Sequence, residues 1–187
     1  MAAIMRGVAA ALALLALAAP ASAAHWTVDT AKSRLGFTVM WTNRPFVAEF
    51  KSWKADIDFD PSDLANSHVV ATVDLSSEAS DSFDNDDGLK GALGFAVDKF
   101  PTARFETTRF VRLADGSYTA EAKLTIRGMT RPVNLPFKLI VAGKRAHVTA
   151  MAFVDRTAFG VGQGEWAAPD PVAHLVTVTL DLAATKN

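Results

Sequence analysis

The sequence of 187 residues contains no cysteine, which excludes disulfide bonds, thiolate metal ligands and thiol nucleophiles. It also lacks an excess of either charge, since 19 Lys and Arg residues stand against 20 Asp and Glu residues and the formal net charge is −1. Such a balance provides no electrostatic attraction toward nucleic acid or an anionic membrane surface. We therefore expect a fold held together by packing, with no nucleic-acid partner.

Residues that carry catalysis or bind metals are few and dispersed. No two of the four histidines are at metal-binding spacing: His25, His68, His147 and His174. The acidic run of residues 81–87 departs from the EF-hand pattern because Phe83 would occupy the first ligand position. No G-x-S-x-G motif is present, and the glycines of residues 160–164 lack the dinucleotide-binding spacing. The sequence predicts no catalytic residue, no metal site, no cofactor and no enzyme activity; a triad assembled in space around Ser33 is the alternative left open.

Long hydrophobic runs are also missing. The apolar run of residues 8–19 is about a dozen residues long, whereas a membrane-spanning helix needs roughly 20. It follows Arg6 and ends at Pro20 and the small-residue triplet Ala21-Ser22-Ala23, which is the pattern of a secretory signal peptide. We predict a cleavable signal peptide over residues 1–23, export to the periplasm and no stable membrane anchor, with residues 24–187 forming a single domain.

The rest of the chain shows a period-two alternation of apolar and polar residues, interrupted by short turn clusters. This alternation is typical of strands with one buried face. It predicts about eight antiparallel strands, near residues 35–41, 55–59, 69–75, 102–107, 118–126, 133–141, 146–154 and 174–182. One helix is predicted at residues 84–91, with Asp84 as a candidate N-cap. Eight antiparallel strands can close into a barrel, so the predicted fold class is an all-β, eight-stranded antiparallel barrel with one short helix.

The predicted inner faces of these strands carry several small residues: Ala120, Ala122, Ala146, Ala150 and Ala152. Small residues on an inner face leave room for a ligand. Bulky residues on neighbouring strands, such as Phe37 and Phe137, could instead interdigitate with the alanines and fill the core, because protein interiors pack to near-crystal density. Alternation alone leaves the cavity and the filled core equally open.

Several separated motifs follow one another along the chain. The first half contains Trp26-Thr27-Val28-Asp29, Ser33, Phe37, Phe59-Asp60-Pro61, Asp86-Asp87-Gly88-Leu89-Lys90, Phe95, Phe100-Pro101 and Phe105. The second half contains Leu124-Thr125-Ile126-Arg127-Gly128-Met129-Thr130-Arg131-Pro132-Val133, Arg156, Phe159-Gly160-Val161-Gly162, Glu165 and Trp166. With these motifs the chain resembles the YceI-like family of periplasmic lipid- and polyisoprenoid-binding proteins.

This resemblance implies a lipocalin-like barrel that encloses a long-chain isoprenoid or fatty lipid for transport, storage or sensing. Face alternation and the family motifs together select the candidate ligand-binding residues Phe37, Val39, Trp41, Ile57, Phe59, Leu89, Phe95, Phe105, Leu124, Ile126, Phe137 and Phe159. The chain departs from the family pattern at Lys32, Asn85 and Gly88, where His, Arg and His are frequent in other members. These departures lie near the expected cavity mouth, so the resemblance implies more about the lipid tail than about its head group.

A function of another class stays open beside the lipid carrier. With a filled core, the same barrel would suit a non-catalytic accessory protein of a membrane quinone or electron-transfer system. An enzyme acting on lipids is the third alternative, and a homodimer is also left open.

The signal-peptide prediction has a direct test. Because the small-residue triplet immediately precedes Ala24, N-terminal sequencing of the protein from a periplasmic extract should begin at Ala24. A mature protein that begins at Met1 and sediments with membranes would contradict the predicted export.

Overall fold

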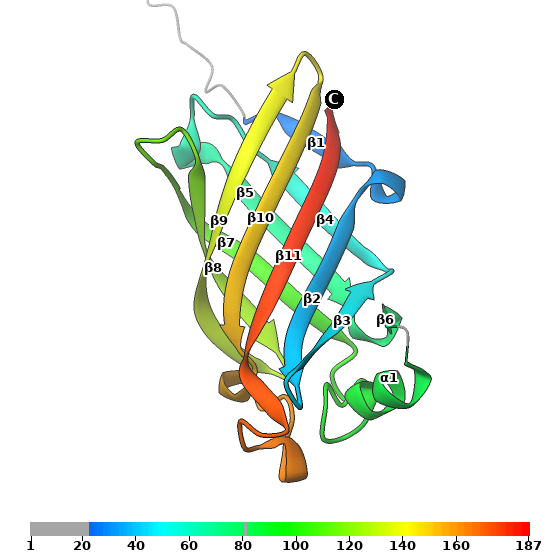
Figure 1. The fold of residues 1–187 in the computed structure, drawn as a ribbon. Helices are drawn as coiled ribbons and strands as arrows, with labels where there is room; N and C mark the ends of the chain where they lie inside the picture. Colours follow the sequence, from blue (N-terminus) through cyan, green and yellow to red (C-terminus); the bar gives the residue numbers. More distant parts are fainter. Residues whose placement is uncertain (1–22, 81) are drawn as a thin grey trace, which may run out of the picture.

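The computed structural model describes residues 23–80 and 82–187, so the predicted signal peptide lies outside the described residues except for Ala23. The described chain is mostly antiparallel sheet (Figure 1). Its strands are β1 His25–Val28, β2 Arg34–Trp41, β3 Arg44–Phe50, β4 Trp53–Asp58, β5 His68–Asp74, β6 Glu78–Ala79, β7 Thr102–Arg112, β8 Tyr118–Ile126, β9 Met129–Ala142, β10 Arg145–Asp155 and β11 Val172–Lys186. The α-helix α1 spans Phe83–Lys90, and single turns of 3-10 helix occur at Thr30–Lys32, Leu64–Asn66, Leu75–Ser77, Arg156–Phe159 and Gly164–Trp166.

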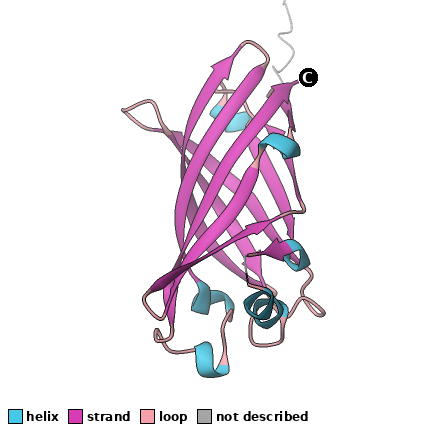
Figure 2. Cartoon of the chain, turned by 45° about the vertical axis from the view of Figure 1, so that its right-hand side comes forward, coloured by secondary structure: helices cyan, strands magenta, loops and turns pink. Residues whose placement is uncertain are grey.

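Eight strands close into a barrel in the order β1-β4-β5-β7-β8-β9-β10-β11, and β11 returns to β1. The closing contact pairs Trp26 of β1 with Lys186 of β11 on one side and with Ile57 of β4 on the other. One end of the barrel carries β1, the C-terminus and the β9–β10 hairpin, and we call it the terminus end (Figure 1). The other end carries α1 and the 3-10 turns of residues 156–166, and we call it the helix end (Figure 2). The predicted fold class, an all-β, eight-stranded antiparallel barrel with one short helix, is confirmed.

Three further strands widen the wall toward the helix end. Strand β2 pairs with β11 over Arg34–Trp41, β3 pairs with β2, and the short β6 pairs with β3. The sequence analysis placed β2 among its eight strands and missed β1, β3 and β6. Strands β1 and β6 are too short for alternation to reveal, and β3 contains Pro45 and follows a two-residue turn without glycine. That turn, Thr42-Asn43, has positive φ at both residues, 45° and 62°, which a β-branched threonine rarely adopts.

The helix begins one residue earlier than predicted. Residue Ser82, with an extended backbone, occupies the N-cap position of α1, whereas the predicted N-cap Asp84 lies inside the first turn. Serine and aspartate are both favoured N-caps, and the sequence offered both within three residues, so propensity could not choose between them. The predicted N-cap was therefore wrong, although the helix itself is present.

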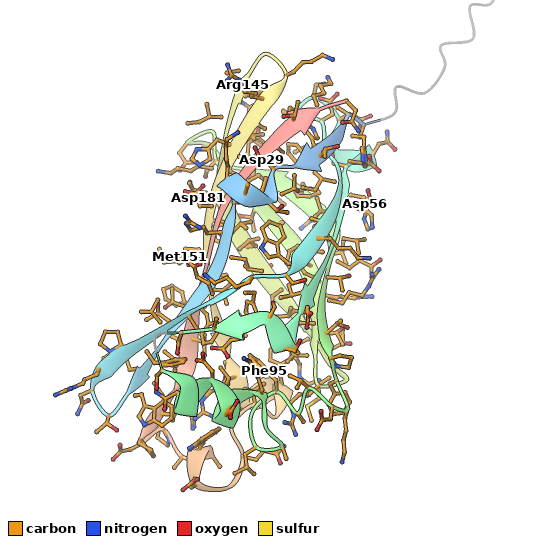
Figure 3. All side chains as sticks on the ribbon, turned by 90° about the vertical axis from the view of Figure 1, so that its right-hand side faces the viewer. Asp29, Asp56, Phe95, Arg145, Met151 and Asp181 are labelled. Atoms are coloured by element: carbon orange, nitrogen blue, oxygen red, sulfur yellow. The ribbon has the colours of Figure 1, made fainter. Side chains whose placement is uncertain are left out.

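The alternation of apolar and polar residues along the strands places polar side chains outside the barrel and apolar side chains inside it. Charged residues such as Asp56, Arg145 and Asp181 project from the outer wall (Figure 3). Apolar residues point inward and form two buried clusters, one around Trp26 and Phe59 near the terminus end and one around Phe95 and Phe159 near the helix end. Within the described residues, no helix is both long enough and apolar enough to span a membrane.

One carboxyl group, that of Glu78, is buried inside the fold. Glu78 of β6 is 1% exposed, and neither of its carboxylate oxygens has a hydrogen-bond partner among the described residues. The nearby Asp86 of α1 is also buried, and it accepts hydrogen bonds from the backbone N–H and the hydroxyl of Ser80. The pKa of Glu78 is raised from 4.5 to about 7, first by burial and second by the nearby Asp86 charge, while the Lys90 charge partly offsets these two effects.

This raised pKa predicts the direction in which stability changes with pH. The folded protein holds the Glu78 proton more tightly than the unfolded chain, so the resulting stabilisation is complete below about pH 4.5 and is lost as pH rises to about 7. The variant Glu78→Gln stays neutral and avoids this loss. Chemical denaturation should therefore show the variant gaining about 1–3 kcal/mol relative to wild type between pH 5 and pH 8.

The partly exposed Glu121 provides the control for this experiment. Its pKa is lowered by the hydrogen bond from Arg109, so Glu121→Gln should show no such gain over the same pH range. A Glu78→Gln variant whose stability relative to wild type is the same at pH 5 and pH 8 would contradict the assignment.

Candidate functional site

The barrel interior contains unfilled space in two adjoining cavities. The larger, near the helix end, has a volume of about 290 Å³, and the smaller, near the terminus end, about 100 Å³. Both are lined by the same six residues at mid-barrel, Ile57, Val69, Phe105, Leu135, Leu180 and Leu182. The two cavities therefore lie end to end along the barrel and form one elongated apolar interior.

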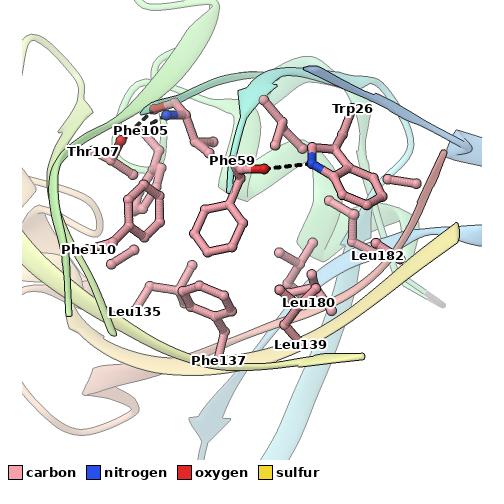
Figure 4. A pocket seen from close by; sticks show the side chains of 16 residues that line it. Trp26, Phe59, Phe105, Thr107, Phe110, Leu135, Phe137, Leu139, Leu180 and Leu182 are labelled. Atoms are coloured by element: carbon pink, nitrogen blue, oxygen red, sulfur yellow. Dashed lines mark hydrogen bonds between the residues drawn. The ribbon is translucent and has the colours of Figure 1, made fainter. Parts of the chain in front are cut away.

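Aromatic rings line the smaller cavity near the terminus end (Figure 4). The Phe59 ring lies 5.0 Å from Phe110 and 6.0 Å from Phe137, both edge-on, and Tyr118 stacks on Phe137 at 5.3 Å. The indole N–H of Trp26 donates a buried hydrogen bond of 2.9 Å to the Phe59 carbonyl, so the only polar group of this ring is satisfied. Packed aromatic rings therefore narrow this end of the interior.

The larger cavity is walled partly by β2 and β3, the strands that widen the barrel. The Phe37 ring lies 5.6 Å from Phe50, and Phe50 lies 6.0 Å from Phe95, which comes from the loop after α1. Toward the helix end, the Trp41 ring meets Trp166 edge-on at 5.9 Å. Four partly exposed residues there line the cavity and also reach the protein surface, so the cavity approaches solvent between them: Trp41, Phe46, Asn85 and Trp166.

All twelve candidate residues selected from the sequence lie on the walls of this interior. The larger cavity is lined by Phe37, Val39, Trp41, Ile57, Leu89, Phe95, Phe105, Leu124, Ile126 and Phe159. The smaller cavity is lined by Phe59 and Phe137, and also by Ile57 and Phe105. The structure thus brings the twelve residues together in one place, and their role as ligand contacts is taken up as a proposal below.

Sequence reasoning missed a second set of lining residues. The alternation of β11 could have supplied Val176, Val178, Leu180 and Leu182. Phe46 and Phe50 lie in the unrecognised strand β3, and Trp166 lies in a 3-10 turn that has no periodicity to reveal it. The residues missed on β11 and β3 flank the predicted residues of β2, since Val178 pairs with Phe37 and Phe46 pairs with Val39.

A buried arginine shapes the helix end of the larger cavity. Arg156 is 6% exposed and donates to six backbone carbonyls, those of Val161, Gly162, Trp166, Ala168, Val172 and Ala173. Every nitrogen of the guanidinium is engaged, and these bonds hold the segment from the 3-10 turns to β11 in place. Arg156 therefore stabilises the cavity wall and has no donor left for a ligand.

The loop after α1 is fixed by a second arginine. Arg127, in the β8–β9 turn, donates 3.0 Å to the carbonyl of Ala92 and also donates to that of Gly94. The same loop then places Phe95 against the cavity. Arg127 belongs to the motif of residues 124–133, and its hydrogen bonds to the two loop carbonyls give it a structural role.

Gly88 of α1 lies directly against Trp166. A Cβ atom at Gly88 would come within 2.9 Å of the indole, so any larger residue would displace the ring. A histidine here would therefore have to move the Trp166 ring. The contact lets Trp166 cover the cavity beside Asn85.

One histidine stands close to carboxylates on the outer wall. His25 Nδ1 lies 3.0 Å from Asp58 Oδ1 and 3.6 Å from Asp56 Oδ1, and the three atoms are close enough together to be ligands of one metal ion. The three side chains are 47–75% exposed and lie outside the cavities. Sequence spacing could not reveal this cluster, because β1 and β4 bring it together across the sheet.

A family model described as the YceI-like domain matches residues 26–184 of this chain. A UPF0312 protein of Vibrio cholerae is 27% identical over 135 residues, which cover 71% of this chain and 71% of the relative. A UPF0312 protein of Photorhabdus laumondii is 28% identical over 135 residues, which cover 71% of this chain and 70% of the relative.

Solved structures show the same fold. BcnA of Burkholderia cenocepacia superposes with a TM-score of 0.81 at 29% identity, covering 84% of this chain and 99% of BcnA. A polyisoprenoid binding domain from Saccharophagus degradans, implicated in plant cell wall breakdown, superposes with a TM-score of 0.68 at 14% identity. The match covers 88% of this chain and 99% of that domain. The YceI protein of Campylobacter jejuni superposes with a TM-score of 0.66 at 18% identity, covering 75% of this chain and 84% of the Campylobacter protein. With a family model that spans nearly all of the barrel, the chain belongs to the YceI-like family.

Proposed function

We propose that this protein binds one long apolar lipid, a polyisoprenoid or a fatty chain, inside the barrel in the periplasm, for transport, storage or sensing. The observation that carries the proposal is the elongated interior, which is apolar along its length and retains a cavity of about 290 Å³. A protein core normally packs without such space, so the unfilled volume favours a ligand over a filled core. The polyisoprenoid binding domain with the same fold supports the choice of ligand.

The driving force for this binding is the burial of hydrocarbon. Each methylene removed from water contributes about 0.8 kcal/mol, and a long chain supplies many of them. Part of this gain offsets the translational and conformational freedom that the lipid loses. The aromatic walls need no specific polar contact to hold the tail.

The residues on the cavity walls also favour binding of a lipid without catalysis of a reaction. No Ser, His, Asp, Glu or Lys is present among the described residues that line the two cavities. Thr107 lines the smaller cavity, and its hydroxyl accepts a hydrogen bond of 2.8 Å from the Val69 backbone N–H. A bound lipid would therefore meet no nucleophile and no general base, and we propose that the protein is not an enzyme.

A substitution that fills the cavity tests the proposal. Leu124 lines the larger cavity from the middle of β8, and Leu124→Trp adds volume there. In an empty cavity the larger ring should be tolerated, so the lipid-stripped variant should unfold within about 1 kcal/mol of stripped wild type; a filled core would lose about 1–3 kcal/mol. Uptake of geranylgeraniol, followed by native mass spectrometry, should fall at least tenfold.

Lys123→Trp provides the matched control, because Lys123 is exposed on the outer face of the same strand. This variant should retain normal uptake. Severe destabilisation of Leu124→Trp, together with no uptake by stripped wild type, would mean that the interior is packed solid, and the lipid-binding proposal would fail.

A further inference from the structure

The polar groups at the larger cavity bear on which lipids can enter it. Arg156 is the one charged side chain among the described residues that line this cavity. An anionic head group needs donors that can turn toward it, but all the guanidinium N–H groups of Arg156 already donate to backbone carbonyls. The cavity therefore offers no available cationic donor to a phosphate or a carboxylate.

Two asparagines, Asn85 and Asn134, also line this cavity. Asn134 is exposed on β9 between the cavity-lining Val133 and Leu135, so the strand alternation turns its side chain outward, and Asn85 is the asparagine whose side chain can face the cavity. Asn85 lies on α1, lines the larger cavity where the wall reaches the surface, and is partly exposed. Its side-chain amide makes no hydrogen bond to the described residues, and an amide can both donate and accept. This side chain is thus available to hydrogen-bond the polar end of a lipid whose tail lies deeper in the barrel.

The charges around Asn85 further disfavour an anion. Asp86 and Glu78 are buried on the same side of the barrel, and Asp87 is exposed on α1. Lys90 lies in the last turn of α1, and its charge partly offsets the rise in the pKa of Glu78, but it does not line the cavity. An anionic head beside Asn85 would meet more acidic groups than basic ones.

We infer that the larger cavity selects long apolar molecules with an uncharged, hydrogen-bonding head group, such as a hydroxyl, carbonyl or carboxamide, and that Asn85 holds this head. This inference rests on the proposed lipid binding and narrows its ligand class. Phosphorylated isoprenoids and ionised fatty acids are excluded by the lack of an available cation.

The inference is tested by matched ligands that differ only at the head. Stripped full-length protein is titrated with geranylgeraniol, with geranylgeranyl phosphate and with the parent hydrocarbon that lacks a head group, and the complexes are quantified by native mass spectrometry. Wild type should bind the alcohol at least tenfold more tightly than the phosphate. At pH 8, wild type should likewise bind hexadecanamide more tightly than palmitate.

Substitutions at Asn85 then assign the head-group contact. Asn85→Leu should bind the alcohol about three- to tenfold more weakly, the effect of one lost hydrogen bond, and should bind the hydrocarbon as wild type does. Asn85→Arg supplies a free cation and should bind the phosphate more tightly than wild type does.

The outcomes separate this inference from the proposed function. Uptake of the phosphate as tight as that of the alcohol overturns the head-group inference and leaves lipid binding intact. Equal weakening of alcohol and hydrocarbon by Asn85→Leu also overturns it, because Asn85 would then act on the tail or on the fold. Failure of wild type to take up any of the three ligands overturns the proposed function itself.

Discussion

The barrel depends on the hydrogen bonding of its C-terminal strand. Strand β11 pairs with β10 along one edge, and along the other it pairs first with β2 and then with β1. The short β1 closes the eight-stranded ring at the terminus end, where aromatic rings pack in the interior and the smaller cavity lies. Toward the helix end β2 pairs with β11 and β3 extends the sheet from β2, and the larger cavity lies there. One strand with two successive partners thus gives the interior a narrow end and a wide end.

The sequence predicted the long strands well, because their alternation reports burial directly. Tyr118, Ala120 and Ala122 of β8 are all buried, as the pattern required. It could not predict the features that arise from contacts distant in sequence. The turn at Thr42-Asn43, the cover formed by Trp166 and the outer cluster around His25 are set by tertiary packing that no local pattern encodes. The resemblance to a family, rather than periodicity, pointed to Phe95 and Phe159, which lie outside strands.

The polar side chains near the cavity differ in how their hydrogen-bonding groups are satisfied. Arg156 is buried but fully bonded to carbonyls, so it acts as a fixed cross-link of the helix end. Glu78 is buried without a partner among the described residues, and the raised pKa keeps it largely protonated below neutral pH. Asn85 lines the cavity, and its amide makes no hydrogen bond to the described residues. The described lining is therefore apolar along most of its length, with polar side chains near the helix end.

The central claim is that the interior holds a long lipid in the working protein. It is tested most directly by native mass spectrometry of the full-length protein expressed in its own host, exported and purified without detergent, followed by solvent extraction of the complex. The account predicts a discrete added mass of a few hundred daltons that extraction releases as an isoprenoid or fatty-chain lipid. Protein that carries no added mass, and that takes up no long-chain lipid when one is supplied, would contradict it.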